Sequence, residues 1–208
     1  MIKLRMHVDI NRAIAKLGKV PEIVQEKAAA AAINKTVAKA KTEMVRQITR
    51  EYAVKASDVR PQLNVSKASW KSGKMTGTLH AFAVHKGHRS RNVILFDAKA
   101  VQGTGAPKRI NVHFPDGKWR TITVREGGGV SVKIKRNGGR RLIKGAFIGN
   151  KGRTVFIRTG DGRQIKPVET LDIPQMFNTR KINEAVIQRV RAEFPVEMQR
   201  ALKLYMPK

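Results

Sequence analysis

The stretch Asn137–Pro167, NGGRRLIKGAFIGNKGRTVFIRTGDGRQIKP, indicates most clearly how the middle of this 208-residue chain folds. Its short apolar runs, such as AFI and TVFIR, are separated by Asn137-Gly138, Asn150-Lys151-Gly152 and Gly160-Asp161-Gly162. Asn-Gly is among the strongest short signals for a β-hairpin. Connections this short favour antiparallel strands, because a parallel crossover needs about a dozen residues or more. The stretch therefore predicts a meander of hairpins.

The β region extends outward from this stretch over residues 75–168. MTGTLHAFAV and, after it, the apolar run NVILFDA are both predicted to be strands. INVHF alternates apolar and polar residues, Pro115-Asp116-Gly117 has turn chemistry, and WRTITV returns the chain. These last elements form a loop or hairpin insertion over residues 100–129. We expect an antiparallel sheet, meander or partial barrel.

Helices are expected on both sides of the β region. Residues 22–53 are rich in strong helix formers, and one apolar stripe recurs at steps of three and four residues. Its members are Ala30, Ile33, Val37, Ala40, Met44, Ile48 and Tyr52. This stripe favours packing in the core, and part of it is a candidate contact with a neighbouring subunit. A short helix over residues 10–17, capped by Asp9, is expected before it.

The last helix is expected over residues 179–206, with Thr179 as its N-cap. Its apolar stripe consists of Ile182, Val186, Val190, Phe194, Met198, Leu202 and Tyr205. Pro195 lacks a donor and crowds residue 191, so we expect a kink there or a second helix that begins there. The chain as a whole is predicted to be a single α+β domain, helical over residues 1–60 and 179–206.

The charge of the chain is its most unusual property. It has 43 Lys and Arg against 15 Asp and Glu, a formal net charge of +28. Such a chain repels copies of itself and attracts polyanions, so its partner is a nucleic acid, an acidic protein surface or an anionic lipid. Residues 130–166 alone contain eleven Lys and Arg and one acid, which concentrates the cations on the predicted β region.

Within this basic region eight side chains are candidates for contact with DNA or another polyanion. Lys133 and Lys135 are expected to share one strand face opposite the apolar Val130, Val132 and Ile134. The arginines near the Asn137-Gly138 turn are expected at a hairpin tip. The full candidate set is Lys133, Lys135, Arg136, Arg140, Arg141, Lys144, Lys151 and Arg153. Such a set suits phosphates, whose recognition depends on charge and not on base edges. The other interpretation is a lysine-rich edge that prevents sheets from aggregating.

Catalytic chemistry has little support in the sequence. The chain has no cysteine, which excludes disulfides, thiolate zinc sites and cysteine nucleophiles. No phosphate-binding loop has the required glycine spacing, and the few carboxylates of the β region are scattered. We predict no catalytic residue, no metal site and no cofactor, and thus a protein that is not an enzyme. No stretch approaches the roughly 20 apolar residues of a membrane span, so we expect no membrane contact.

Several short motifs resemble the phage minor tail protein Z family, the tail completion proteins of long-tailed phages. AAAAAINKTV matches an alanine-rich helix with the step Ala32-Ile33-Asn34-Lys35. RRLIKGAFI resembles an Ile-Pro-Gly-Ala-Phe-Ile signature, with Lys144 where proline is common and with Gly145, Ala146, Phe147 and Ile148 intact. VFIR, IPQMF with Pro174, and the basic RAEFPVEMQRAL also fit. Residues 101–126 do not match.

The resemblance implies a structural role in the virion. Family members act late in tail assembly at the head-proximal end, where they help to join tail and head and to seat the end of the genome. The implied partners are other phage tail and head-tail connector proteins, double-stranded DNA, and copies of this chain in a ring, a hexamer by analogy. The implied location is the virion tail, after synthesis in the host cell cytoplasm. The alternative function is a general nucleic-acid-binding protein that contacts phosphates without sequence specificity.

Overall fold

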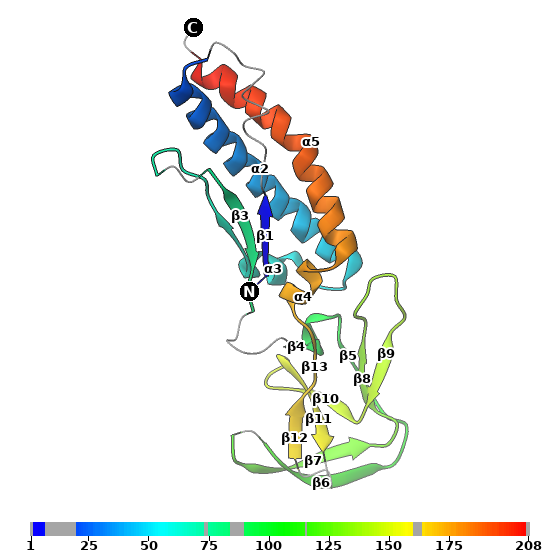
Figure 1. Ribbon diagram of the computed structural model, residues 1–208. Helices are drawn as coiled ribbons and strands as arrows, with labels where there is room; N and C mark the ends of the chain where they lie inside the picture. Colours follow the sequence, from blue (N-terminus) through cyan, green and yellow to red (C-terminus); the bar gives the residue numbers. More distant parts are fainter. Residues whose placement is uncertain are drawn as a thin grey trace. The chain divides into compact units, whose positions relative to one another are not determined.

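The computed structural model of the chain has the predicted α+β fold. It describes residues 20–72, 75–83, 90–114, 116–159 and 164–206, together with the backbone of residues 2–6. The helix expected over residues 10–17 and the Gly160-Asp161-Gly162 connection lie outside these residues. The chain forms two compact units (Figure 1). Unit 1 comprises residues 1–48, 59–87 and 173–208, and unit 2 comprises residues 49–58 and 88–172.

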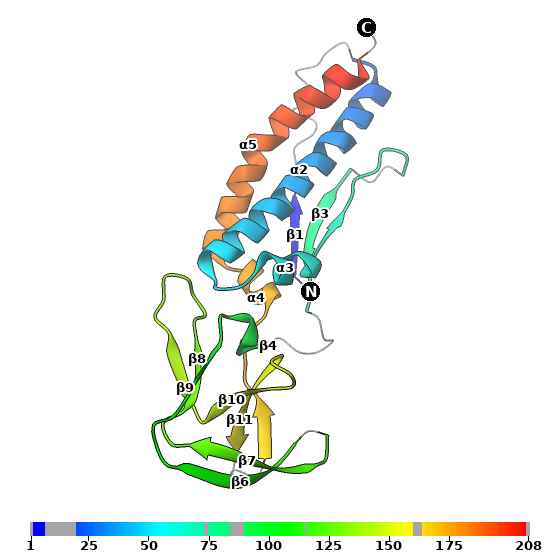
Figure 2. The ribbon, with the colours of Figure 1, turned by 180° about the vertical axis from the view of Figure 1, so that it is seen from behind.

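Unit 1 is built on two long helices that run side by side in both views (Figures 1 and 2). These are α2 (Glu22–Glu51), of which the last turn belongs to unit 2, and α5 (Arg180–Tyr205), which the short helix α4 (Ile173–Phe177) precedes. Every residue of the apolar stripe predicted for α2 is buried, so that prediction is confirmed. In α5 the predicted stripe is buried from Ile182 to Leu202, whereas Tyr205 at the helix end is 39% exposed.

Pro195 lies inside α5 without ending it. The expectation of a second helix that begins at Pro195 is wrong, because the helix is continuous from Arg180 to Tyr205. The neighbouring side chains Phe194, Glu197 and Met198 are all buried. Their packing holds the helix together across the one position where the proline cannot donate a hydrogen bond. The ribbon of α5 curves along its length (Figure 1).

A small antiparallel sheet completes unit 1. Its order is β1 (Ile2–Met6), β3 (Gly77–Ala81) and β2 (Leu63–Ser66). The short helices α3 (Ala56–Val59), which straddles the two units, and η2 (Arg60–Gln62) precede β2. The sheet lies close to α2, since a Cβ atom on Gly77 would be 2.5 Å from a methyl group of Val37.

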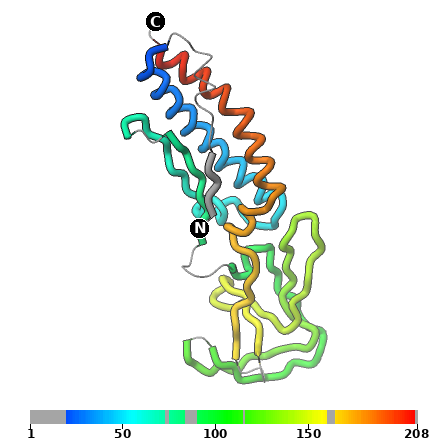
Figure 3. The backbone as a smooth tube through the Cα atoms, in the orientation of Figure 1, coloured from blue at the N-terminus to red at the C-terminus, as the bar shows by residue number. Residues whose placement is uncertain are grey.

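Unit 2 consists of short strands in three small sheets, and its connections can be followed in Figure 3. The five-stranded sheet has the order β10 (Ala146–Gly149), β11 (Thr154–Thr159), β12 (Gln164–Pro167), β6 (Pro107–His113) and β7 (Trp119–Arg125). The second has the order β5 (Lys99–Val101), β8 (Gly129–Val132) and β9 (Arg141–Lys144). The third pairs β13 (Glu169–Leu171) with β4 (Ser90–Asn92).

The predicted hairpins are present, but the purely antiparallel arrangement is wrong at one place. β8 and β9, β10 to β12, and β6 and β7 all pair antiparallel. β12 pairs in parallel with β6 at Gln164 and His113, which are about 50 residues apart in sequence. This pairing joins two separate hairpins into one sheet, which local turn chemistry does not specify.

Asn92 organises the core of unit 2. Its side chain accepts hydrogen bonds from the backbone N–H groups of Val155 and Ile94, at 2.8 and 3.1 Å, and donates one to the Val155 carbonyl at 2.9 Å. This amide caps η3 (Val93–Leu95), so NVILFDA forms a 3₁₀ turn and not the expected strand. Val93 then packs in a buried cluster with Val130, Val132, Ala146 and Val155.

Candidate functional site

The candidate cations begin where β8 ends, at Val132. Beyond it the backbone pairs with other segments. The N–H groups of Lys133 and Arg136 donate to the carbonyls of Phe96 and Glu51, at 3.1 and 2.9 Å. Lys135 forms an isolated bridge with Tyr52. The expectation that one regular strand carries Lys133 and Lys135 is therefore wrong, because remote segments take over the backbone hydrogen bonds.

Arg140 holds the loop around Asp97 in place. Its guanidinium donates to the carboxylate and the carbonyl of Asp97 and, at 2.9 Å, to both the hydroxyl and the carbonyl of Ser131. Asp97 has a φ of 44°, which is uncommon for a residue with a side chain. The hydrogen bond from Arg140 is the main cause that keeps the pKa of the Asp97 carboxyl below its ordinary value. Arg140 thus uses its hydrogen-bond donors for contacts within unit 2.

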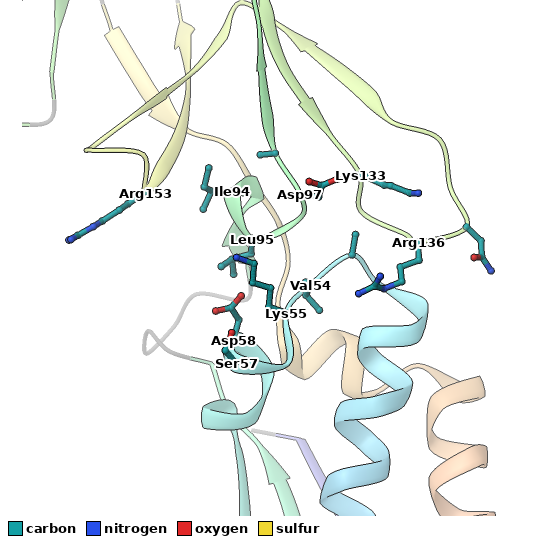
Figure 4. A pocket seen from close by; sticks show the side chains of 13 residues that line it. Val54, Lys55, Ser57, Asp58, Ile94, Leu95, Asp97, Lys133, Arg136 and Arg153 are labelled. Carbon is teal, nitrogen blue, oxygen red and sulfur yellow. The ribbon is translucent and has the colours of Figure 1, made fainter.

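A cleft of about 1020 Å³ opens within unit 2 beside this loop (Figure 4). Its wall comes from three parts of the chain: residues 53–58 after α2, residues 94–98, and residues 133–137, with Arg153 from a fourth. Four cations line it, namely Lys55, Lys133, Arg136 and Arg153, against two acids, Asp58 and Asp97.

The cations of this cleft differ in whether their side chains form hydrogen bonds or ion pairs with other residues. Arg136 donates from Nε to the carbonyl of Thr49. Among the described residues, the side chains of Lys55 and Arg153 make no hydrogen bond or ion pair. Lys133 contributes only a charge attraction to Asp97, whose carboxylate Arg140 already holds. Three cations therefore remain available to a phosphate or a carboxylate from outside.

Lys55 is a cleft residue that the sequence analysis missed. It lies in the connection after α2, about 75 residues before the basic stretch, and no motif surrounds it. The hydrogen bond from Ala53 N–H to the Ile134 carbonyl, at 2.9 Å, brings the two segments together. Only the long-range pairing of these two segments identifies Lys55.

Other candidate cations lie elsewhere on unit 2. Arg141 and Lys144 are both exposed on β9, but they are three residues apart and so point to opposite faces of the strand. Lys151 is exposed in the turn after β10, with a φ of 54°. Lys135 pairs weakly with Glu51 at 3.7 Å. The structure thus brings Lys133, Arg136 and Arg153 together in the cleft, without Lys135, Arg140, Arg141, Lys144 and Lys151 on its wall.

The surplus of cations is shared by both units. Unit 2 contains 21 Lys and Arg against 8 Asp and Glu, and unit 1 contains 22 against 7. The β region is therefore no more basic overall than the helical unit, although residues 130–166 remain the densest basic stretch. Acids in unit 1 are largely engaged: Lys39 lies 2.5 Å from both Glu193 and Glu197.

The motif residues make structural contacts within each of the two units, and among them Ala146 is buried. The Asn34 amide donates to the Ala68 carbonyl at 2.9 Å and accepts from the Ala68 N–H at 2.7 Å, which fastens α2 to the chain beyond β2. Pro174 lies at the start of α4. Gly145 has a φ of 71°, and Ala146 and Ile148 pack in or against the buried cluster of unit 2. The Arg158 guanidinium carbon lies over the Phe147 ring, 4.4 Å from the centre of the ring.

The described residues offer no grouping of three metal-ligating side chains. Nor does any helix in the described part of the chain have the length and hydropathy of a membrane span. The cleft brings four cations and two acids together around one space, an arrangement that suits the binding of an anionic group.

Comparison with known proteins supports the family resemblance that the motifs indicate. No curated protein and no solved structure matches the chain significantly. The family model for Prophage minor tail protein Z (GPZ) matches residues 9–207, which is nearly the whole chain. A minor tail protein is a structural component of the virion and contacts other virion proteins. The chain therefore belongs to the prophage minor tail protein Z family.

Proposed function

We propose that this tail protein acts at the head-proximal end of the tail, in tail completion and head-tail joining. In this role it forms a ring of identical subunits, a hexamer by analogy with neighbouring tail components. The cations of unit 2 then face the DNA or an acidic partner ring. It acts by binding and assembly and not by catalysis.

The observation that carries this proposal is the cleft of unit 2. Lys55, Lys133 and Arg153 are supplied by separate segments, and no acid of the described chain neutralises their side chains in an ion pair. Contacts to phosphate position a protein on DNA without reading its sequence, which suits a component that must hold any genome end. Repeated around a ring, such clefts form a positive collar.

A general nucleic-acid-binding function is the second candidate. It is favoured by the equal share of surplus cations in the two units, since a protein that coats nucleic acid needs charge over much of its surface. The two functions differ in their consequence for the particle. Only the first requires an intact cleft for the joining of heads to tails.

The test is a complementation experiment in a phage or induced prophage that lacks this protein. The triple variant Lys55→Gln, Lys133→Gln and Arg153→Gln removes the unpaired cations of the cleft and keeps long polar side chains. We expect heads and tails that are complete in electron micrographs but unjoined, and a loss of infectious titre by about two orders of magnitude or more. This magnitude assumes that three phosphate or carboxylate contacts are lost in each subunit.

The matched control removes the same number of cations of the same kinds from unit 1. Lys67, Arg191 and Lys203 are exposed and make no ion pair or side-chain hydrogen bond among the described residues. Their triple change to Gln should leave the titre near that of the natural protein. If the cleft variant yields joined, infectious particles at the control level, the cleft has no role in joining. If it loses DNA binding without an assembly defect, the general binding function is correct.

A further inference from the structure

The hairpin of β6 and β7 carries a second surface that the basic stretch does not include. It spans Pro107–Arg125, in the segment where the family motifs of the sequence do not match. The two strands pair over seven residues each, from Pro107 with Arg125 to His113 with Trp119. At about 3.4 Å per residue, each face of this ribbon is about 20 Å long.

One face of the hairpin belongs to the core. Val112 on this face is fully buried, and Ile110, Ile122 and Val124 are half-buried. The cations of the same face are occupied: Lys108 pairs with Glu126 at 2.9 Å, and Arg120 pairs with Asp116. Both acids near the hairpin are thereby engaged on this side.

The residues of the opposite face are all exposed except His113, which is half-buried, and none of them is acidic. The residues of this platform are Pro107, Arg109, Asn111, His113, Trp119, Thr121, Thr123 and Arg125. Among the described residues Arg109 and Arg125 have no ion pair and no side-chain hydrogen bond. The polar pair in the middle is preorganised, since the Thr121 hydroxyl donates to the Asn111 side-chain oxygen at 2.6 Å.

Trp119 at the end of the platform is 58% exposed, which is unusual for the largest apolar side chain. His113 lies beside it with ring centres 5.1 Å apart. Exposed Trp119 and half-buried His113 thus lie at one end of a strand face, and the unpaired Arg109 and Arg125 lie about 14 and 20 Å further along it. Proteins hold unpaired bases and their phosphates with such combinations of aromatic and basic side chains. A duplex hides its base faces, so its binding gains nothing from the aromatic pair.

We propose that this platform binds single-stranded nucleic acid, with bases stacked on Trp119 and His113 and phosphates on Arg109 and Arg125. A purely acidic peptide would satisfy the arginines alone and leave Trp119 without a partner. The inference uses none of the cleft residues, so its failure and that of the proposed function can be told apart.

The test compares single-stranded oligonucleotides with and without bases. A chain with a charge of +28 binds any polyanion at low salt, so total affinity alone decides nothing. Fluorescence anisotropy with a labelled ten-residue oligothymidylate and an abasic oligomer of equal charge, at about 0.2 M salt, isolates the contribution of the bases. The full chain should prefer the oligothymidylate by roughly tenfold or more, which Trp119→Ala should abolish and Trp119→Phe should largely keep.

Two further measurements make the outcome decisive. In a Trp70→Phe background, the fluorescence of Trp119 should be quenched by the oligothymidylate and not by polyglutamate or a ten-base-pair duplex. The double change Arg109→Gln and Arg125→Gln should weaken the binding of both oligomers equally. The control Lys203→Gln should weaken the binding of either oligomer only by the small effect of losing one positive charge. Equal binding of the two oligomers by the natural chain, or quenching by polyglutamate alone, would overturn the inference.

Discussion

Gly145 connects β9 and β10 with a φ of 71°, in the left-handed region that favours glycine. A Cβ atom at this position would meet nothing within 4 Å. The glycine is therefore required by its backbone conformation and not by lack of space. We expect Gly145→Ala to lower the free energy of unfolding by about 1–2 kcal/mol, the cost of the left-handed region for an L-residue. Urea unfolding, followed by circular dichroism, measures this change.

Gly139 supplies the matched control for this prediction. A Cβ atom there also meets nothing within 4 Å, but no positive φ is found at this residue. Gly139→Ala should leave stability unchanged or raise it by about 0.4–1 kcal/mol, because it restricts the unfolded chain. If both variants are equally stable, the conformation at Gly145 does not explain its place in the motif.

Individual candidate cations also differ in whether their side chains are already bound within the protein. Arg140 and Arg153 are both arginines of the same basic stretch. Arg140 is bound to Asp97 and Ser131, whereas Arg153 lines the cleft without a partner among the described residues. Charge density in a sequence therefore overestimates the number of side chains that can contact a partner.

An ion-pair cluster joins the two long helices of unit 1. Lys39 of α2 contacts both Glu193 and Glu197 of α5, and Arg189 and Arg200 contact the same carboxylates at 2.7 Å. Glu197 is only 7% exposed. The hydrogen bond from Lys39 is the largest cause that lowers the pKa of each carboxyl below its ordinary value of 4.5.

The lowered pKa values determine how the contribution of this ion-pair cluster to stability depends on pH. A carboxyl with a lower pKa in the folded state contributes stability above its unfolded value, and this contribution is lost as the pH falls through the folded value. Glu197→Gln should therefore be less stable than the natural protein at pH 7, and the difference should shrink as the pH falls below about 4.5. Urea unfolding from pH 7 to pH 3 measures the difference at each pH.

The control for this element is Glu184→Gln on the same helix. Glu184 pairs with Arg180 at 2.7 Å, but the Arg180 side chain is 92% exposed, so solvent screens the pair. This variant should remain within about 0.5 kcal/mol of the natural protein across the range. A difference for Glu197→Gln that stays constant from pH 7 to pH 3 would show that the cluster acts through packing and not through charge.

At the scale of the whole molecule, the charge of +28 opposes the proposed ring. Electrostatic repulsion extends about 10 Å at 0.1 M salt and about 3 Å at 1 M salt. Self-association should therefore be weak at low ionic strength and become stronger as salt approaches 1 M or when a polyanion is added. Analytical ultracentrifugation would detect species above the 23.2 kDa monomer.

Sodium chloride and potassium chloride at equal concentration screen charge equally and serve as the control, since both should give the same mass of the protein. A monomer at every salt concentration, with and without polyanion, would contradict the ring of identical subunits. Association that weakens with salt would point to contacts between opposite charges and not to screened repulsion.

The elements that depend on local periodicity and turn chemistry can be predicted from the amino-acid sequence. The stripes of α2 and α5 were predicted residue by residue, apart from Tyr205 at the end of α5. The hairpins of Asn137–Pro167 were also predicted, although the turn expected at Asn137-Gly138 lies one residue earlier, because the Gly138 N–H donates to the Lys135 carbonyl at 3.1 Å. These features follow from repeats of 3.6 and 2 residues and from residues with special backbone preferences, all of which are visible within a short window.

The contacts between remote segments, in contrast, become visible only in the folded chain. It pairs β12 in parallel with β6, turns Val93–Leu95 into a 3₁₀ helix beneath the Asn92 side chain, and brings Lys55 to Lys133. It also decides which cations are already engaged and which face of the β6–β7 hairpin is buried. These outcomes depend largely on packing and hydrogen bonds between residues about 40 to 90 positions apart, and no local pattern encodes such partners.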